Sequence, residues 1–276
     1  MEGDGMADDR QRARIMITVK TYPELSSKYR ETSCVAGIRL DLGSPRHVRL
    51  FPVPFRLLKQ GAQFKKYSIV EVDVRPHHGD RRPESLRPDL DTLEVVGHVP
   101  SSDGGKRRYA YVEPLVAPSL CAIKRDQETK GASLGVFRPA EITDFRLAKA
   151  EPWPPAKAAL ADQLDLFDQE LRRLEWIPFE FRYRFRCADG ACTGHDMGLK
   201  DWEAGESYRK YRRTYGEQAV LDKLRERWFD RMVTPDRAVH CFVGNIAARP
   251  HTFMLLSLFS PQRNVVDFVQ DDLFSL

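Results

Sequence analysis

The segment Phe179–Arg186, with the sequence FEFRYRFR, constrains the fold more than any other part of this chain. Aromatic residues alternate with charged residues along the whole segment. Because successive side chains of a β-strand point to opposite faces, the pattern predicts a strand with one aromatic face and one face that carries arginines. The chain must therefore form a sheet that packs this aromatic face against a core.

Short runs with strand character also fill the first half of the chain, separated by turn residues and prolines. The predicted strands are Arg14–Lys20, Cys34–Leu40, His47–Phe51, Lys66–Arg75, Leu120–Lys124, Ser133–Arg138 and Ile142–Lys149. We expect Pro76–Pro88 to be a loop, since it holds three prolines and many charges. Many short strands between turn signals favour a barrel or a sandwich, so we predict a β-rich, barrel-like N-terminal half.

The character of the sequence changes at Glu151–Pro155, where prolines break regular structure. Two helices are predicted after this point, Ala156–Glu175 from its apolar stripe and Trp202–Met232, and two strands follow, Val239–Val243 and Thr252–Phe259. The predicted fold class is therefore α+β, and no internal repeat is visible. We divide the chain into a disordered leader (1–12), a β-rich OB-like domain (13–150), an α+β domain with a possible zinc site (151–262) and a C-terminal tail (263–276).

The composition narrows the class of protein. No apolar run approaches the ~20 residues of a membrane-spanning helix. Residues 1–14 lack the apolar core of a signal peptide, so we expect a cytoplasmic protein. Five cysteines, an odd number, argue against a disulfide framework and leave buried thiols or a metal site as interpretations. The formal net charge of +4 is by itself weak evidence for a polyanionic partner.

A candidate metal site follows the aromatic strand directly. Cys187, Cys192 and His195 stand on either side of a glycine-containing turn, which can direct two sulfurs and a nitrogen toward one tetrahedral zinc ion. We expect a structural zinc rather than a catalytic one, because no general base is clearly placed. The candidates for a fourth ligand are Cys34, Cys121, His240 and Cys241. The alternative is that the two cysteines are small buried residues and His195 is a loop histidine.

A basic surface is predicted where this strand meets the helix after Glu206. Its arginines and lysine share one sign of charge and alternate with aromatic rings, a combination that suits phosphates and bases. The candidate nucleic-acid-binding residues are Arg182, Arg184, Arg186, Arg209, Lys210, Arg212 and Arg213. The alternative is a solvated helix face whose tyrosines point to the core.

The stretch Lys20–Phe55 carries a family resemblance in SCVAGIRL and in the following HVRLFPVPFR. It resembles the opening of uncharacterised bacterial proteins described as carrying dual OB-type domains. The resemblance covers about the first third of the chain. It implies association with nucleic acid, often in defence or modification gene neighbourhoods.

The C-terminal tail resembles the bacterial sliding-clamp-binding peptide, Gln-x-x-Leu-Phe, through Gln270, Leu273 and Phe274. A short flexible tail can present such a ligand at a small ordering cost, but the same residues could instead pack on the body. A second match at Gln163–Phe167 lies on the apolar stripe of a predicted helix, and we interpret it as core.

The sequence contains no phosphate-binding glycine loop, no HExxH and no GxSxG. We therefore predict a nucleic-acid-binding accessory protein that acts on or beside DNA. The expected partners are DNA or RNA, and the tail adds the sliding clamp as a candidate partner. One alternative is a metal-dependent nuclease or modifying enzyme. Its candidate acids are Glu71, Asp73, Asp196, Asp201 and Glu203. The other alternative is an adaptor that binds proteins alone.

Overall fold

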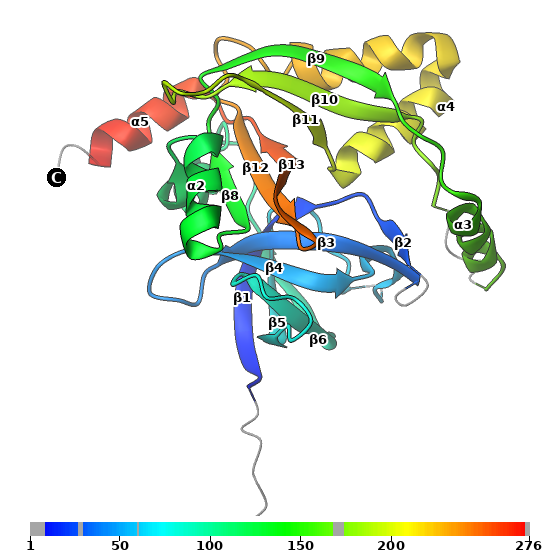
Figure 1. Cartoon of the computed structure of the whole chain (residues 1–276). Helices are drawn as coiled ribbons and strands as arrows, with labels where there is room; N and C mark the ends of the chain where they lie inside the picture. Colours follow the sequence, from blue (N-terminus) through cyan, green and yellow to red (C-terminus); the bar gives the residue numbers. More distant parts are fainter. Residues whose placement is uncertain (1–8, 27–29, 60, 168–173, 274–276) are drawn as a thin grey trace, which may run out of the picture.

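The structure is a computed structural model that describes residues 9–26, 30–59, 61–167 and 174–273, with residues 26, 30, 163–167 and 269–273 described by their backbone alone (Figure 1). Within this part of the chain, no helix combines the length and the apolar character needed to cross a lipid bilayer.

The N-terminal part of the chain forms a closed barrel. Its strands are β1 (Gln11–Lys20), β2 (Glu24–Ser26), β3 (Arg30–Arg39), β4 (Arg46–Val53), β5 (Ser68–Pro76) and β6 (Ser85–His98). They follow the order β1-β5-β6-β4-β3-β2, and an additional pairing of β1 with β3 closes five of them into a ring. β4 and β6 are parallel, whereas the other neighbours are antiparallel. This confirms the predicted OB-type barrel.

Strand periodicity fills this barrel. In β5 the side chains of Val70, Val72 and Val74 are buried, while Ile69, Glu71 and Asp73 on the other face are partly exposed. The valines join an apolar cluster inside the barrel with residues from β1, β3, β4 and β6. The alternation that predicted β5 is thus the alternation that fills the barrel.

The rest of the chain forms a second sheet. Its strands are β7 (Val116–Ala117), β8 (Leu134–Phe137), β9 (Glu141–Lys149), β10 (Phe179–Arg186), β11 (His195–Leu199), β12 (His240–Ile246) and β13 (Arg249–Phe259). They follow the order β7-β8-β12-β13-β11-β10-β9. β8 and β9 precede residue 150 and yet belong to this sheet, so the division between the two sheets lies between His98 and Val116.

The two sheets share one connectivity. β8 and β9 are consecutive in the chain, and β8 pairs with β12 while β9 pairs with β10. If β8 and β9 are counted as one interrupted strand, the strands of the second sheet follow the order one-two-three-five-four. The five strands of the closed first barrel, without β2, follow the same order. In both cases the third and fifth strands are parallel: β4 and β6 in the barrel, and β11 and β13 in the second sheet. The described structure therefore contains two OB-type arrangements.

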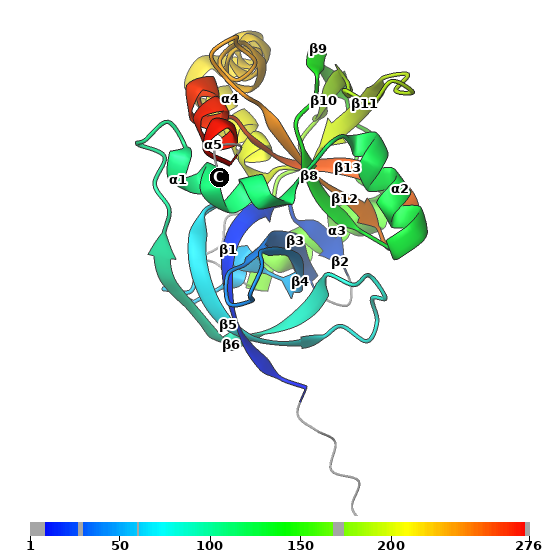
Figure 2. The ribbon, with the colours of Figure 1, turned by 90° about the vertical axis from the view of Figure 1, so that its left-hand side faces the viewer.

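Five α-helices are described: α1 (Lys106–Val112), α2 (Leu120–Lys130), α3 (Pro155–Phe167), α4 (Trp202–Arg225) and α5 (Arg263–Leu273). α2 packs on β8 and β13, and α4 packs on β9. Figures 1 and 2 both show α2 beside β8. A π-helical turn, Glu226–Asp230, continues α4, which is kinked at Gly216, where φ is 77°.

Three expectations on local structure need correction. Leu120–Lys124 begins a helix, because Ser119 caps it by accepting the N–H of Ala122 and Gly131 ends it in a left-handed conformation. β6 begins at Ser85, inside the predicted loop. α5 occupies most of the segment that we expected to be a flexible tail, and Val265 and Val266 anchor it in the core.

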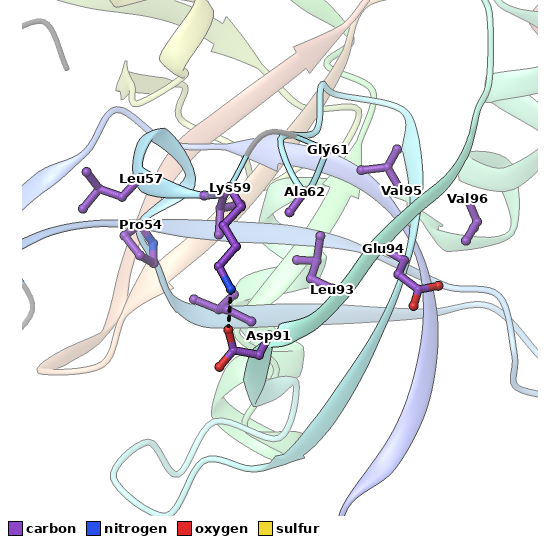
Figure 3. Close-up of a pocket in the computed structure, with 12 residues that line it drawn as sticks. Pro54, Leu57, Lys59, Gly61, Ala62, Asp91, Leu93, Glu94, Val95 and Val96 are labelled. Atoms are coloured by element: carbon purple, nitrogen blue, oxygen red, sulfur yellow. Dashed lines mark hydrogen bonds and ion pairs between the residues drawn. The ribbon is translucent and has the colours of Figure 1, made fainter. Parts of the chain in front are cut away.

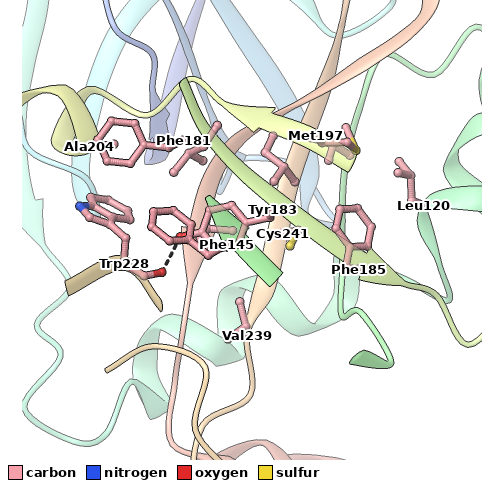
Figure 4. Packing of buried hydrophobic residues seen from close by; sticks show 14 of the residues in the cluster. Leu120, Phe145, Phe181, Tyr183, Phe185, Met197, Ala204, Trp228, Val239 and Cys241 are labelled. Atoms are coloured by element: carbon pink, nitrogen blue, oxygen red, sulfur yellow. Dashed lines mark hydrogen bonds between the residues drawn. The ribbon is translucent and has the colours of Figure 1, made fainter. Parts of the chain in front are cut away.

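Aromatic residues dominate the core of the second sheet. The predicted inner face of β10 is buried. Phe181 and Tyr183 pack against Phe145 of β9 (Figure 4), and Phe185 packs against Phe137 of β8. The Tyr183 hydroxyl donates a hydrogen bond to the backbone carbonyl of Trp228.

A further apolar cluster joins the two sheets. It unites buried residues of β1, β3, β8, β12 and β13, among them Met16, Ile38, Val136, Phe242 and Leu256. Because both sheets share this cluster, burial of apolar surface holds them together as one body.

Candidate functional site

Cys187, Cys192 and His195 converge on one point, and Cys121 completes the group. The ligand atoms of these four side chains all lie within 4.8 Å of one another. The His195 Nε2 atom lies 3.4 Å from the Cys192 sulfur and 3.5 Å from the Cys121 sulfur. A Cys₃His cluster of this size could hold a metal ion.

Two distances within the cluster are compatible with a tetrahedral zinc site. Zinc bonds of about 2.3 Å to sulfur and about 2.0 Å to nitrogen place neighbouring sulfur and nitrogen ligands ~3.5 Å apart at tetrahedral angles. The two sulfur–nitrogen distances agree with this value. Three sulfurs and one imidazole nitrogen are also a donor set that zinc takes in structural sites.

Three elements position the ligands. Cys121 lies in the first turn of α2, Cys187 follows the last residue of β10, and His195 begins β11. The turn between β10 and β11 is tied to α2, because Arg125 donates to the Asp189 carboxylate at 2.8 Å. A metal ion here would link a helix to a hairpin.

The local environment favours the metal-binding form at Cys192 and His195, and the protonated thiol at Cys187 and Cys121. The Cys192 sulfur accepts the backbone N–H groups of Cys187 and Gly194, each at 3.4 Å, and the bond from Cys187 is the main cause of a lowered pKa at Cys192. Burial raises the pKa of Cys187, and raises that of Cys121 to about 12. Burial lowers the pKa of His195, which favours the neutral imidazole, the form that binds a metal. A bound cation would lower the pKa of all three thiols and so oppose the effect of burial at Cys187 and Cys121.

The other fourth-ligand candidates lie outside the cluster. Cys241 is buried in β12, Cys34 belongs to β3, and the His240 ring packs against Tyr109 and Phe259. Sequence reasoning left Cys121 among four candidates because it placed this residue on a strand. Ser119, two residues before Cys121, and Gly131 are signals for the start and the end of a helix. These signals would have placed Cys121 in the first turn of a helix.

The candidate acids of the nuclease alternative are paired with cations. Asp196 accepts from Arg182 at 2.8 Å and Arg146 at 2.6 Å, and the arginine hydrogen bonds outweigh the effect of burial, so its pKa is lowered. Asp201 and Glu203 both bind Lys66.

Glu71 and Asp73 lie on the outer face of β5 within 4 Å of Arg12 or Arg14. Among the described residues, these five acids are therefore spread over three ion-pair groups, and they do not form one carboxylate cluster.

Four of the seven candidate nucleic-acid-binding residues are also ion-paired. Asp196 on β11 lies across from Arg184 and binds both Arg182 and Arg184. Arg209 is buried and binds Glu175 and Glu206, and Arg212 shares Glu175. The remaining three, Arg186, Lys210 and Arg213, are exposed, and no ion pair to them is found in the described residues.

A cleft of about 650 Å³ lies between the first barrel and the second sheet, and we call it the basic cleft. Six lysine and arginine residues line it: Lys65, Lys66, Arg108, Arg227, Arg231 and Arg237. Glu203 is the one acidic residue among the described residues of its lining.

Ion pairs neutralise part of this charge. Lys66 binds Asp201 and Glu203, and Arg231 binds Glu226. The other four cations form no ion pair within the described part of the chain. Arg108 donates to the Val99 carbonyl and lies 3.5 Å from the Nε2 atom of His98, and Arg237 donates to the Ser260 carbonyl. Lys65 and Arg227 are exposed at the surface. The cleft therefore keeps a strong positive charge.

A hollow of similar size on the outside of the first barrel has a different character (Figure 3). Its lining is mainly apolar and includes the exposed Val95 and Val96. Lys59 is its single lysine, and its ammonium lies 3.3 Å from the Asp91 carboxylate. Size alone therefore does not single out the basic cleft, but charge does.

The sliding-clamp residues cannot be placed in the same way. α5 runs through Gln270 and Leu273, but their side chains and the whole of Phe274 lie outside the described residues. Recruitment by a sliding clamp stays a prediction from the sequence.

Comparisons with known proteins give two family matches. Residues 116–275 match the domain of unknown function DUF8757, and residues 11–114 match the domain of unknown function DUF8758. The boundary between the matches coincides with the division between the two sheets. A search of the curated proteins found no match.

Two solved structures show a remote similarity. A murine DNA-binding protein bound to double-stranded DNA is 8% identical at a TM-score of 0.31, with 91% of this chain and 96% of that chain covered. The HINb domain of p204 is 10% identical at a TM-score of 0.31, with 93% and 100% covered. These likenesses are too distant to carry an argument. The family match over residues 116–275 covers more than half of the chain, which therefore belongs to the DUF8757 family.

Proposed function

We propose that this protein binds nucleic acid, with the phosphate backbone in the basic cleft between its two OB-type sheets. The observation that carries the proposal is the charge of the cleft. Four cations without a carboxylate partner in the described structure, Lys65, Arg108, Arg227 and Arg237, line one concave surface. A polyanion gains affinity from such a surface by releasing counterions.

The rigid frame around the cleft supports the proposal. Lys66 and Glu203 link the two walls, and a shared apolar cluster holds the two sheets together. The backbone segments that carry the cations are therefore fixed relative to one another before a ligand arrives, which reduces the entropy that binding costs. The repeated OB-type connectivity also supports a relationship to bacterial proteins with dual OB-type domains.

Within this proposal, the Cys₃His cluster binds one structural zinc ion. All four coordination positions are filled by protein ligands, which leaves no open position for a substrate. The zinc ion would fix the hairpin between β10 and β11 on α2, and thus the end of the sheet that carries Arg186. The ion is a structural part of the binding protein and takes no part in a reaction.

Charge reversal in the cleft tests the binding site. In the variant Lys65→Glu/Arg227→Glu, two exposed cations without described ion pairs become anions, so folding should be unaffected. We expect the affinity for a fluorescein-labelled oligonucleotide, measured by anisotropy, to fall by roughly tenfold or more.

The matched control is Arg186→Glu/Arg213→Glu, which reverses two exposed arginines of the surface predicted from the sequence. The control should retain most of the affinity. If the control loses affinity and the cleft variant does not, the phosphate backbone lies on the surface of β10 and α4 instead. If the wild-type protein binds no oligonucleotide at low salt, the proposed function is wrong.

A further inference from the structure

The loop between β9 and β10 holds two tryptophans that the basic cleft does not use. Trp153 lies before α3 and Trp176 lies shortly before β10, and both side chains are partly exposed. The Trp176 Nε1–H donates to the Glu151 carbonyl at 3.1 Å, and the Ala150 N–H donates to the Pro178 carbonyl at 2.9 Å. These bonds fasten the two ends of the loop together and hold Trp176 at the end of the sheet.

The two indoles form a wall between two hollows. One hollow, of about 460 Å³, extends to Tyr22 and Phe179, and the other, of about 380 Å³, extends to Arg212. Trp153 and Trp176 line both hollows. We call the two hollows together the aromatic groove. Concave sites of this size, with aromatic walls, are typical binding places for flat organic groups.

The charges of the aromatic groove are nearly balanced, in contrast to those of the basic cleft. Lys157 pairs with Glu24, Arg212 pairs with Glu175, and Lys200 lies 3.9 Å from Glu180. Long-range attraction of phosphates is therefore weak here. The chemistry that the groove offers is the face of an aromatic ring, on which any nucleobase can stack.

The aromatic groove and the basic cleft meet at the first turn of α4. Asp201, Ala204 and Gly205 line the groove, and Glu203 lines the cleft. The groove and the cleft are therefore lined by neighbouring residues at the same end of α4, so one strand is long enough to occupy both. In a duplex the bases are paired and stacked, so they cannot reach the indoles.

We propose that the aromatic groove binds unstacked bases of a single-stranded nucleic acid whose phosphates lie in the basic cleft. The inference rests on the proposed function and makes it more specific: the preferred ligand is a single strand. Trp153 and Trp176 provide the stacking faces.

The test compares a fluorescein-labelled oligothymidine with the duplex that it forms with its complement. In Trp153→Ala/Trp176→Ala, the affinity for the single strand should fall by roughly tenfold for each ring, and the affinity for the duplex should stay unchanged. Trp153→Phe/Trp176→Phe, which keeps two aromatic faces, should restore most of the single-strand affinity. Phe268→Ala is the matched control, because Phe268 is 53% exposed and lies on α5, at the opposite side of the molecule from α3 in Figure 1.

A second measurement does not depend on the folding of the alanine variant. The tryptophan fluorescence of the wild-type protein should be quenched by the unlabelled single strand and much less by the duplex. The quenching should be smaller in the phenylalanine variant, in which only Trp202 and Trp228 remain.

The outcomes separate this inference from the proposed function. If the single strand binds and depends on Lys65 and Arg227, but the tryptophan variants bind it as tightly as the wild type, the aromatic groove is not a base site and the proposed function stands. Equal quenching by duplex and single strand would also overturn the inference. If neither probe binds, both proposals fail.

Discussion

Replacement of Asp201 by asparagine should destabilise the protein strongly, because Asp201 anchors the contact between the first barrel and α4. Its side chain is fully buried, and its Oδ2 atom accepts from the Lys66 ammonium at 2.8 Å and from the Ser257 hydroxyl at 2.7 Å. Its Oδ1 atom accepts the Glu203 N–H at 2.8 Å and caps α4. Burial alone would lower the pKa of Lys66, but the charges of Asp201 and Glu203 outweigh it and raise this pKa.

The magnitude follows from these contacts. Loss of one partner of a buried ion pair costs about 3–5 kcal/mol, because the other charge stays buried and unpaired. Glu203, at 3.0 Å from Lys66 but 49% exposed, remains as a weaker partner. We therefore expect about 3 kcal/mol for Asp201→Asn, which keeps a capping side chain, and about 1 kcal/mol more for Asp201→Ala, which does not.

The assay is urea unfolding followed by circular dichroism, with the double variant Lys66→Met/Asp201→Asn as the control. Replacement of both charges by neutral groups of similar volume is often nearly neutral, so the double variant should recover at least ~1.5 kcal/mol of the loss. If Asp201→Asn is as stable as the wild type or more stable, Asp201 is not the anchor, and the alternative of a catalytic acid regains support.

Three further predictions follow from single sites. Metal analysis should find one zinc ion per chain. Cys121→Ser should remove the ion, and the control Cys34→Ser should keep it. Retention of zinc in Cys121→Ser would exclude the Cys₃His assignment. Burial lowers the pKa of His240 from 6.5 to about 4, so the unfolded chain takes up its proton at a higher pH than the folded chain, and the free energy of unfolding should fall by up to ~3 kcal/mol between pH 6.5 and pH 4. His240→Asn should flatten this decrease in acid unfolding curves, and an unchanged slope would contradict the assignment. Gly205→Ala should lower the melting temperature, because a Cβ atom there would lie 2.3 Å from the Tyr22 ring, and an unchanged melting temperature would show that the ring can move aside.

The sequence predicted the strand with the strongest alternation and the long helix α4, and it missed α2. Phe179–Arg186 is the strand β10 with the predicted bounds, since its two-residue period has no helical interpretation. The N-terminal part of α2 was assigned to a strand, because its apolar residues are few and its capping residues were not used. The shared OB-type connectivity was not visible as a repeat, because strand order depends on pairing and leaves no required residue pattern.

The candidate site was predictable only where the ligands are close in sequence. Cys187, Cys192 and His195 lie within one hairpin, whereas Cys121 arrives from a helix 66 residues before Cys187, so chain folding and not spacing brings it into place. The paired state of Arg182 and Arg184 depends on the register of β11 on β10, which sets Asp196 across from Arg184. The basic cleft is lined by residues from distant parts of the chain, and no local sequence pattern predicts such a surface.

The salt dependence of oligonucleotide binding tests the central claim most directly. Each phosphate contact contributes about 0.7–0.9 to the slope of log affinity against log salt concentration. If four unpaired cations of the basic cleft contact phosphates, the wild-type slope should be about −3 or steeper, and Lys65→Glu/Arg227→Glu should reduce its magnitude by about 2. An equal slope in the wild type and in this variant would show that the cleft does not hold the phosphate backbone.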